Sequence, residues 1–119
     1  MQGRRLLGVG AVFAFLGVAL GAFGVHALRD RLSAEMLAIY QTGVQYQMIH
    51  ALAMVALGAQ ERVPARVTGW CFAIGVVVFS GSLYALAMTG IRMFGAITPF
   101  GGLCFLAGWA WLVLMPPTR

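Results

Sequence analysis

Charged residues are scarce in this sequence. Its 119 residues include no lysine, eight arginines and three acidic residues, so that 9% of the chain is charged. A soluble domain carries about 25% charged residues. Hydrophobic residues make up 61% of the chain, and so few charges could not cover the surface of a small soluble globule. Disorder is also excluded, because a disordered chain combines low hydrophobicity with high charge. The composition predicts a small integral membrane protein with one domain.

Charged residues are missing altogether from four long stretches, which cover residues 6–28, 36–60, 67–91 and 93–118. Each stretch exceeds the length of about 20 residues that a helix needs to cross the hydrocarbon core. The short alternating segments of a membrane β-barrel do not occur. The sequence therefore predicts an all-α fold, a four-helix transmembrane bundle with up-down topology. The single domain covers residues 1–119, with approximate spans 6–28, 36–59, 67–90 and 98–115.

The arginines between the spans predict the orientation. With four spans both termini lie on one side, which then holds five arginines: Arg4, Arg5, Arg62, Arg66 and Arg119. The other side holds three: Arg29, Arg31 and Arg92. The positive-inside rule favours a cytoplasmic N-terminus and C-terminus. Arginines at helix ends suit lipid head groups, whereas a nucleic-acid surface needs them clustered on one face. We expect the lipid bilayer as partner and no nucleic acid.

Cysteine and histidine are also scarce, with two of each. Cys71 and Cys104 lie in different spans without a CxxC spacing, so the sequence predicts neither a disulfide framework nor a zinc site. His26 lies at the end of the first span and His50 well inside the second, which is a poor arrangement for two axial ligands of one haem. We therefore expect no metal and no cofactor.

Polar residues gather in the second span: Gln41, Thr42, Gln45, Tyr46, Gln47 and His50. Thr42, Tyr46 and His50 are spaced four apart and share one face, and Gln47 falls on another side. Polar side chains are costly in lipid and face protein or a watery cavity. The third span offers Ser80 and Ser82 as partners, whose hydroxyls could bond to their own backbone or to the glutamine side chains. These eight residues are the candidate binding site; a buried network that fixes helix register is the simpler interpretation.

Glycines in the first span form a smooth stripe that includes Gly17, Gly21 and Gly24. Such a stripe allows two helix backbones to approach closely. Packing within the bundle is the favoured interpretation, and self-association or docking to a larger complex stays open. In the fourth span, Thr98 is suited to cap a helix whose first residue is Pro99, which would leave 92–96 as an interfacial turn.

Four sequence blocks resemble the YgdD family of small membrane proteins, which has a domain of unknown function and is related to a eukaryotic transmembrane protein of mitochondria. The blocks are FGVHAL at 23–28, YQTGVQYQ at 40–47 followed by HAL at 50–52, FSGSLY at 79–84 and ITPFGG at 97–102. They occur in the family's order over nearly the whole chain. The resemblance implies a four-span protein of the bacterial inner membrane. It supplies no activity, substrate or catalytic residue.

Three functional classes differ in what they require of the membrane interior. A structural, accessory or partner-binding protein, as a homo-oligomer or in a larger membrane complex, requires only a dry, hydrogen-bonded interior. A small channel or carrier for a polar solute or ion would require a water-filled cavity that reaches Gln45 and His50. An enzyme would require a nucleophile, a base or a cofactor ligand within reach of one another, and the spans contain no acid. We expect the first class, keep the second as the alternative, and assign no catalytic residue.

Overall fold

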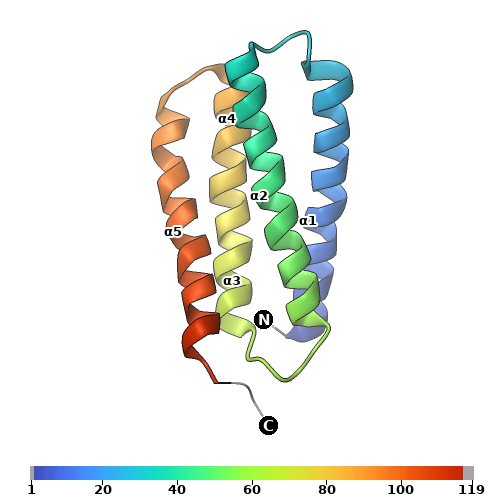
Figure 1. The fold of residues 1–119 in the computed structure, drawn as a ribbon, viewed down its shortest axis with the longest axis vertical. Helices are drawn as coiled ribbons and strands as arrows, with labels where there is room; N and C mark the ends of the chain where they lie inside the picture. The colour runs from blue at the N-terminus through green and yellow to red at the C-terminus, as the bar shows by residue number, and fades with distance from the viewer. Residues whose placement is uncertain (1, 117–119) are drawn as a thin grey trace.

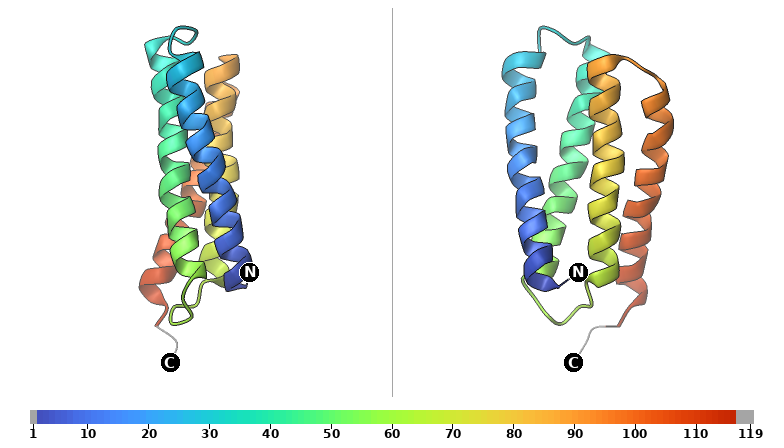
Figure 2. Two further views of the ribbon diagram at one scale, coloured as in Figure 1. Left: turned by 90° about the vertical axis from the view of Figure 1, so that its right-hand side faces the viewer. Right: turned by 180° about the vertical axis from the view of Figure 1, so that it is seen from behind.

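The computed structural model describes residues 2–116, which form four helical rods and no strand (Figure 1). The first rod consists of α1 (Gly3–Phe23) and the π-helical turn η1 (Gly24–Leu28), and the second is α2 (Ala34–Gly58). The third rod consists of α3 (Arg66–Gly75), the π-helical turn η2 (Val76–Ser80) and α4 (Gly81–Thr89), and the fourth is α5 (Met93–Leu114). Consecutive rods run in opposite directions (Figures 1 and 2). The predicted all-α bundle with up-down topology is confirmed.

Three of the rods, covering 3–28, 66–89 and 93–114, are long and apolar enough to cross a membrane. The second rod, α2, is less apolar because it carries the cluster of glutamines and tyrosines. Its 25 residues nevertheless extend about 37 Å at 1.5 Å per residue. It returns the chain from the end of η1 to the start of α3 at the opposite end of the bundle (Figure 1). It therefore crosses the same slab as its neighbours.

Local signals mark the start of the second rod and the end of the third. The Ser33 hydroxyl accepts a hydrogen bond from the Met36 amide at 3.1 Å, and Glu35 lies in the first turn of α2. Both stabilise the positive end of the helix dipole. At the end of α4, Gly90 adopts a left-handed conformation with φ of 72°, which glycine tolerates without strain.

The start of the fourth helix differs from the sequence prediction. The helix α5 begins at Met93, so 93–96 is helical and Pro99 lies inside the helix. Thr98 does not cap the helix start; its hydroxyl bonds to the Phe94 carbonyl at 3.3 Å and to Ser82 at 2.6 Å. Proline lacks one backbone donor, and neighbouring Ser and Thr hydroxyls compensate for such losses in membrane helices. The charge pattern could not reveal this, because the charge-free stretch begins after Arg92 and does not show where within it the helix starts.

The four rods form a flattened, open bundle of 52 × 26 × 17 Å. Helix α1 packs along α2, α2 packs on η2 and α4, and the third rod packs on α5. Helix α1 barely contacts α3, and the backbones of α2 and α5 do not pack against each other. The result is a zigzag with a groove on each face, one between the first and third rods and one between α2 and α5.

The core lies in two clusters along the bundle. The larger cluster consists of Leu6, Met54, Phe72, Val76 and Phe105, and the smaller one of Leu28, Tyr40 and Ala87. The glycine stripe of the first rod faces α2 of the same chain: a Cβ on Gly24 would overlap the Tyr40 ring, and one on Gly21 would come within 3.4 Å of Val44. A Cβ on Gly17 would overlap the end of the Met48 side chain. These glycines allow α1 to pack closely on α2.

The start of α1, the connection 59–65 and the end of α5 lie at the same end of the bundle (Figure 1). Arg4, Arg5, Arg62 and Arg66 belong to this end, whereas Arg119, which the sequence count also used, lies outside the described residues. The cytoplasmic placement of this end stays a prediction.

Candidate functional site

Gln47 joins three of the rods. Its Nε2 donates a hydrogen bond to the Phe13 carbonyl of α1 at 2.8 Å, and its Oε1 accepts one from the Tyr84 hydroxyl of α4 at 2.6 Å. The side chain is buried in α2 between these partners. In a membrane an amide cannot bond to water, so these bonds offset the cost of placing it there. Gln47 is therefore a structural link between α1, α2 and α4.

His50 is the second buried polar group of α2, with 3% of its surface exposed. The indole N–H of Trp109 donates to its Nε2 at 3.0 Å, and its Nδ1 lies 2.7 Å from the Tyr46 carbonyl. Trp can only donate and a carbonyl can only accept, so Nε2 is unprotonated and Nδ1 carries the proton. The ring also stacks on Phe105 with centroids 3.6 Å apart. Both nitrogens of a neutral imidazole are thus occupied within the protein.

The serines of the third rod bond to backbone carbonyls. The Ser80 hydroxyl donates to the Gly43 carbonyl of α2 at 2.7 Å, and the Ser82 hydroxyl donates to the Phe79 carbonyl at 2.8 Å. Thr68 donates to the Gly108 carbonyl of α5 at 3.1 Å. Across residues 2–116, no buried side-chain nitrogen or oxygen lacks a hydrogen-bond partner. The buried polar side chains of these residues therefore satisfy their hydrogen bonds within the protein.

The eight predicted site residues do not form one cluster. Gln47, His50, Ser80 and Ser82 are buried, whereas Gln41 and Gln45 are exposed. The Thr42 hydroxyl bonds within its own helix, to the Ala38 carbonyl at 2.9 Å. Tyr46 is 39% exposed and packs on Phe79 with ring centroids 4.8 Å apart. The structure therefore divides the predicted site into buried, hydrogen-bonded residues and polar residues on the exposed side of α2.

The sequence left two kinds of partner open for the serine hydroxyls, their own backbone and the glutamine side chains. Ser82 bonds to its own backbone at the Phe79 carbonyl and to Thr98, whereas Ser80 bonds to the Gly43 carbonyl of α2 and neither serine bonds to a glutamine. Gln47 bonds instead to Tyr84. The bond between Trp109 and His50 was not predicted from the sequence, because 59 positions separate the two residues.

The outer face of α2 consists of Gln41, Gln45, Ile49 and Leu52, all exposed. Gln45 lies 11 residues after Ala34, so about 16 Å along a helix of about 37 Å. It is therefore near the middle of the membrane. Among residues 2–116, neither Gln41 nor Gln45 has a hydrogen-bond partner for its side-chain amide. This face presents unpaired amides where lipid offers neither donors nor acceptors.

An aromatic groove lies beside this outer face, between α2 and α5. It encloses about 500 Å³ and is lined by Tyr46, His50, Phe79, Pro99, Gly102, Leu103, Phe105, Leu106 and Trp109. Tyr46 is at its edge next to the outer face. The groove exists because the backbones of α2 and α5 stand apart with η2 behind them.

The described residues contain no group of three or more His, Cys, Asp or Glu side chains placed to hold a metal ion. Cys71 and Cys104 are free thiols. His26 lies exposed in η1, whereas His50 is buried, so the two histidines occupy different environments.

Comparison with known proteins finds similarity to bacterial membrane proteins. Residues 20–102 match a family described as "Protein of unknown function (DUF423)". A UPF0382 membrane protein of Staphylococcus saprophyticus is 44% identical over 109 residues, which are 89% of this chain and 91% of the relative. The UPF0382 inner membrane protein YgdD of Escherichia coli is 41% identical over 121 residues, covering 96% of this chain and 90% of the relative. No solved structure matches the chain.

Proposed function

The chain belongs to the DUF423 family, the UPF0382 membrane proteins that include YgdD, and on that premise we propose that it is a non-catalytic structural protein that acts by self-association. The family resemblance expected from the sequence is confirmed. The predicted localisation in the inner membrane is also confirmed, because the relative YgdD is named an inner membrane protein and the chain has helices apolar enough to span a membrane. The family description states no activity. The proposal therefore rests on the chain's own surface.

The observation that carries the proposal is the exposed amide of Gln45 halfway along α2. An amide left unpaired in a hydrocarbon environment costs several kcal/mol. Interhelical hydrogen bonds from Gln and Asn stabilise association of membrane helices. Burial of this amide against another protein would remove the cost.

The partner we propose is a second copy of the same chain. A glutamine amide is both donor and acceptor, so two Gln45 side chains related by a two-fold axis could form reciprocal hydrogen bonds. Symmetric contacts of this kind are the commonest in homo-oligomers. Ile49 and Leu52 lie on the same face and supply apolar contact around the amides, and the aromatic rim of the neighbouring groove extends it.

The hydrogen bonds of the buried polar groups support the non-catalytic part of the proposal. Both nitrogens of His50 and both amide atoms of Gln47 bond within the protein. A catalytic acid, base or nucleophile needs a free atom directed at a substrate. The interior groups are instead committed to holding the rods together.

A second candidate function uses the same exposed amides. In a higher oligomer, Gln41 and Gln45 of several copies could line a central path, and the protein would be a small channel or carrier. In a single chain Gln45 lies on the outside and His50 in the core, so that path would have to form between copies. Solute flux into protein-containing liposomes, lost in Gln45→Leu, distinguishes this function from purely structural association.

Cysteine cross-linking in native membranes tests the proposed interface. In a background with Cys71→Ala and Cys104→Ala, Ile49→Cys reports contact across the outer face of α2, and Val18→Cys on the exposed side of α1 is the matched control. We expect a cross-linked dimer from the first reporter and not from the second. Adding Gln45→Leu should lower dimerisation about fivefold, since two interhelical hydrogen bonds contribute roughly 1 kcal/mol.

Two results would overturn the proposal. One is equal cross-linking from Ile49→Cys and Val18→Cys at matched expression. The other is cross-linking of Ile49→Cys to a different membrane protein, with no adduct of two copies.

A further inference from the structure

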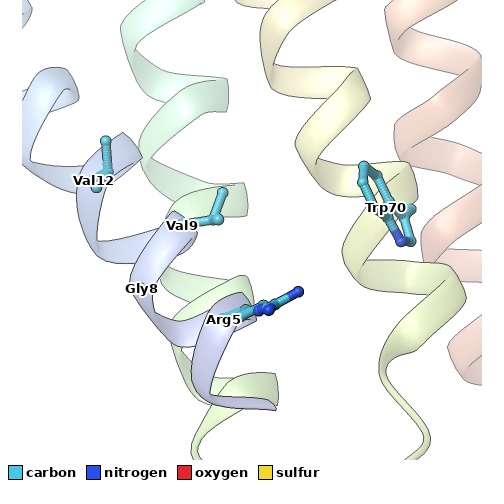
Figure 3. A pocket seen from close by; sticks show the side chains of 5 residues that line it. All are labelled: Arg5, Gly8, Val9, Val12 and Trp70. Carbon is cyan, nitrogen blue, oxygen red and sulfur yellow. The ribbon is translucent and has the colours of Figure 1, made fainter. Parts of the chain in front are cut away.

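The groove between the first and third rods has a different chemistry from the aromatic groove. Its lower part encloses about 510 Å³ and is lined by Arg5, Gly8, Val9, Val12 and Trp70. Figure 3 shows Arg5 reaching from α1 across the groove toward Trp70 on α3. One end is thus cationic and aromatic, and the walls above it are apolar.

Two arginines form the mouth of this groove. A hollow of about 430 Å³ adjoins it and is lined by Gln2, Arg5, Arg66 and Trp70. No acidic residue lines either hollow. Among residues 2–116, neither the Arg5 nor the Arg66 guanidinium has a hydrogen-bond or ion-pair partner. The mouth therefore presents two uncompensated positive charges to one point at the membrane surface.

Trp70 lies where a lipid head group would meet the acyl region. It follows Arg66 by four residues on the same face of α3, and its side chain is 53% exposed. Tryptophan favours this depth because its ring is apolar and its N–H can donate to phosphate or ester oxygens. The indole would contact the lipid just below the two arginines.

The apolar part of the groove is long enough for an acyl chain. A second hollow of about 490 Å³ continues along α1, with Phe13, Leu16, Leu20, Val76 and Val77 among its lining residues. One leaflet of the hydrocarbon core is about 15 Å deep, which corresponds to about ten residues of helix. A chain entering beside Arg5 would therefore end close to Leu16, within the second hollow.

Gly8 keeps the groove open. A Cβ at most other glycines of α1 would come close to α2, but one at Gly8 would have no atom within 4 Å. Close helix packing therefore does not explain this glycine. Leu6, the residue after Arg5, is fully buried against Gly69 and joins α1 to α3. The absence of a side chain at Gly8 leaves the space between the two rods open.

From these features we propose that the groove between α1 and α3 binds one phospholipid with an anionic head group. Arg5 and Arg66 contact the phosphate, Trp70 contacts the glycerol region, and one acyl chain lies over Gly8 along Val9 and Val12. The lipid occupies the leaflet at the end of the bundle that holds the start of α1. This site is on the opposite face of the bundle from the proposed self-association surface and is independent of it.

Native mass spectrometry of the purified protein in mild detergent tests the site. Phosphatidylglycerol and phosphatidylcholine with identical acyl chains are added separately, and inorganic phosphate is added as a competitor. We expect one phosphatidylglycerol to bind in preference to phosphatidylcholine, without displacement by phosphate. Arg5→Gln and Arg66→Gln should each weaken binding about fivefold, the contribution of one basic residue near an anionic lipid surface.

Arg4→Gln is the matched control, because it removes the same charge from the adjacent residue, which lines a different hollow. Gly8→Leu fills the groove without changing charge and should reduce phosphatidylglycerol binding, while the far-ultraviolet circular dichroism stays that of the parent. Equal binding of both lipids would overturn the proposal, as would equal effects of Arg4→Gln and Arg5→Gln. Displacement by inorganic phosphate, or full binding by a folded Gly8→Leu variant, would overturn the assignment of a lipid to this groove.

Discussion

The indole N–H of Trp109 reaches Nε2 of His50 at 3.0 Å and links α5 to α2, two helices whose backbones do not pack against each other. The aromatic rings around this bond fill the gap: Phe105 stacks on the imidazole, and Phe72 meets its edge with centroids 4.9 Å apart. The bond therefore fixes both the tautomer of the histidine and the separation of the two helices.

The tautomer of His50 is a direct prediction of this geometry. Nitrogen-15 spectra of imidazole-labelled protein at neutral pH should show a neutral His50 with the proton on Nδ1, because the Tyr46 carbonyl accepts there and Trp109 donates to Nε2. A His26→Gln variant assigns the signals to His50, since the chain contains only these two histidines. A proton on Nε2 of His50 would contradict the Trp109 hydrogen bond.

Trp109→Phe should lower the free energy of unfolding by about 1 kcal/mol, because Nε2 of His50 loses its donor while most of the aromatic packing remains. The measurement is a denaturant titration in mixed micelles followed by circular dichroism. Trp111→Phe is the control, since no hydrogen bond of its indole occurs within the described residues and its side chain is exposed. Equal losses in both variants would mean that ring size, and not the bond to His50, matters.

The sequence was sufficient to predict the number of helices and their topology, because lipid excludes charge and the arginines therefore mark the helix ends. It could not decide which glutamines are buried. Gln41, Gln45 and Gln47 lie on several sides of one helix, and burial depends on where α1 and α4 dock. The partners of Gln47 are 34 and 37 residues away, and no local pattern encodes such contacts.

Gln47→Leu should destabilise the bundle by about 1–3 kcal/mol, since the Tyr84 hydroxyl loses its acceptor and the link to α1 is removed. The same denaturant titration measures this loss, at protein concentrations low enough to keep the chain monomeric. Gln41→Leu removes an exposed amide from the same helix and should leave the stability of the monomer unchanged. A stable Gln47→Leu variant would show that its two hydrogen bonds contribute little net free energy.

The glycines of α1 should differ in their tolerance of a methyl group according to what each one faces. A Cβ at Gly10 would lie 2.8 Å from the Ala51 carbonyl oxygen and 2.9 Å from the Val55 amide nitrogen. Backbone atoms cannot move aside alone, so Gly10→Ala should cost about 1–3 kcal/mol by forcing α1 away from α2. Gly17→Ala should cost less, because the atoms in its way belong to the flexible Met48 side chain.

Gly8→Ala completes this series as the control, since a Cβ there meets open space. Alanine favours a helix by up to about 1 kcal/mol over glycine, so this variant should be as stable as the parent or more stable. The expected order of unfolding free energies is Gly8→Ala highest, then Gly17→Ala, then Gly10→Ala. If all three variants were equally stable, close contact between α1 and α2 would not hold the first rod in place. If Gly8→Ala were the least stable, the groove beside Arg5 would be a packed interface and not an open site.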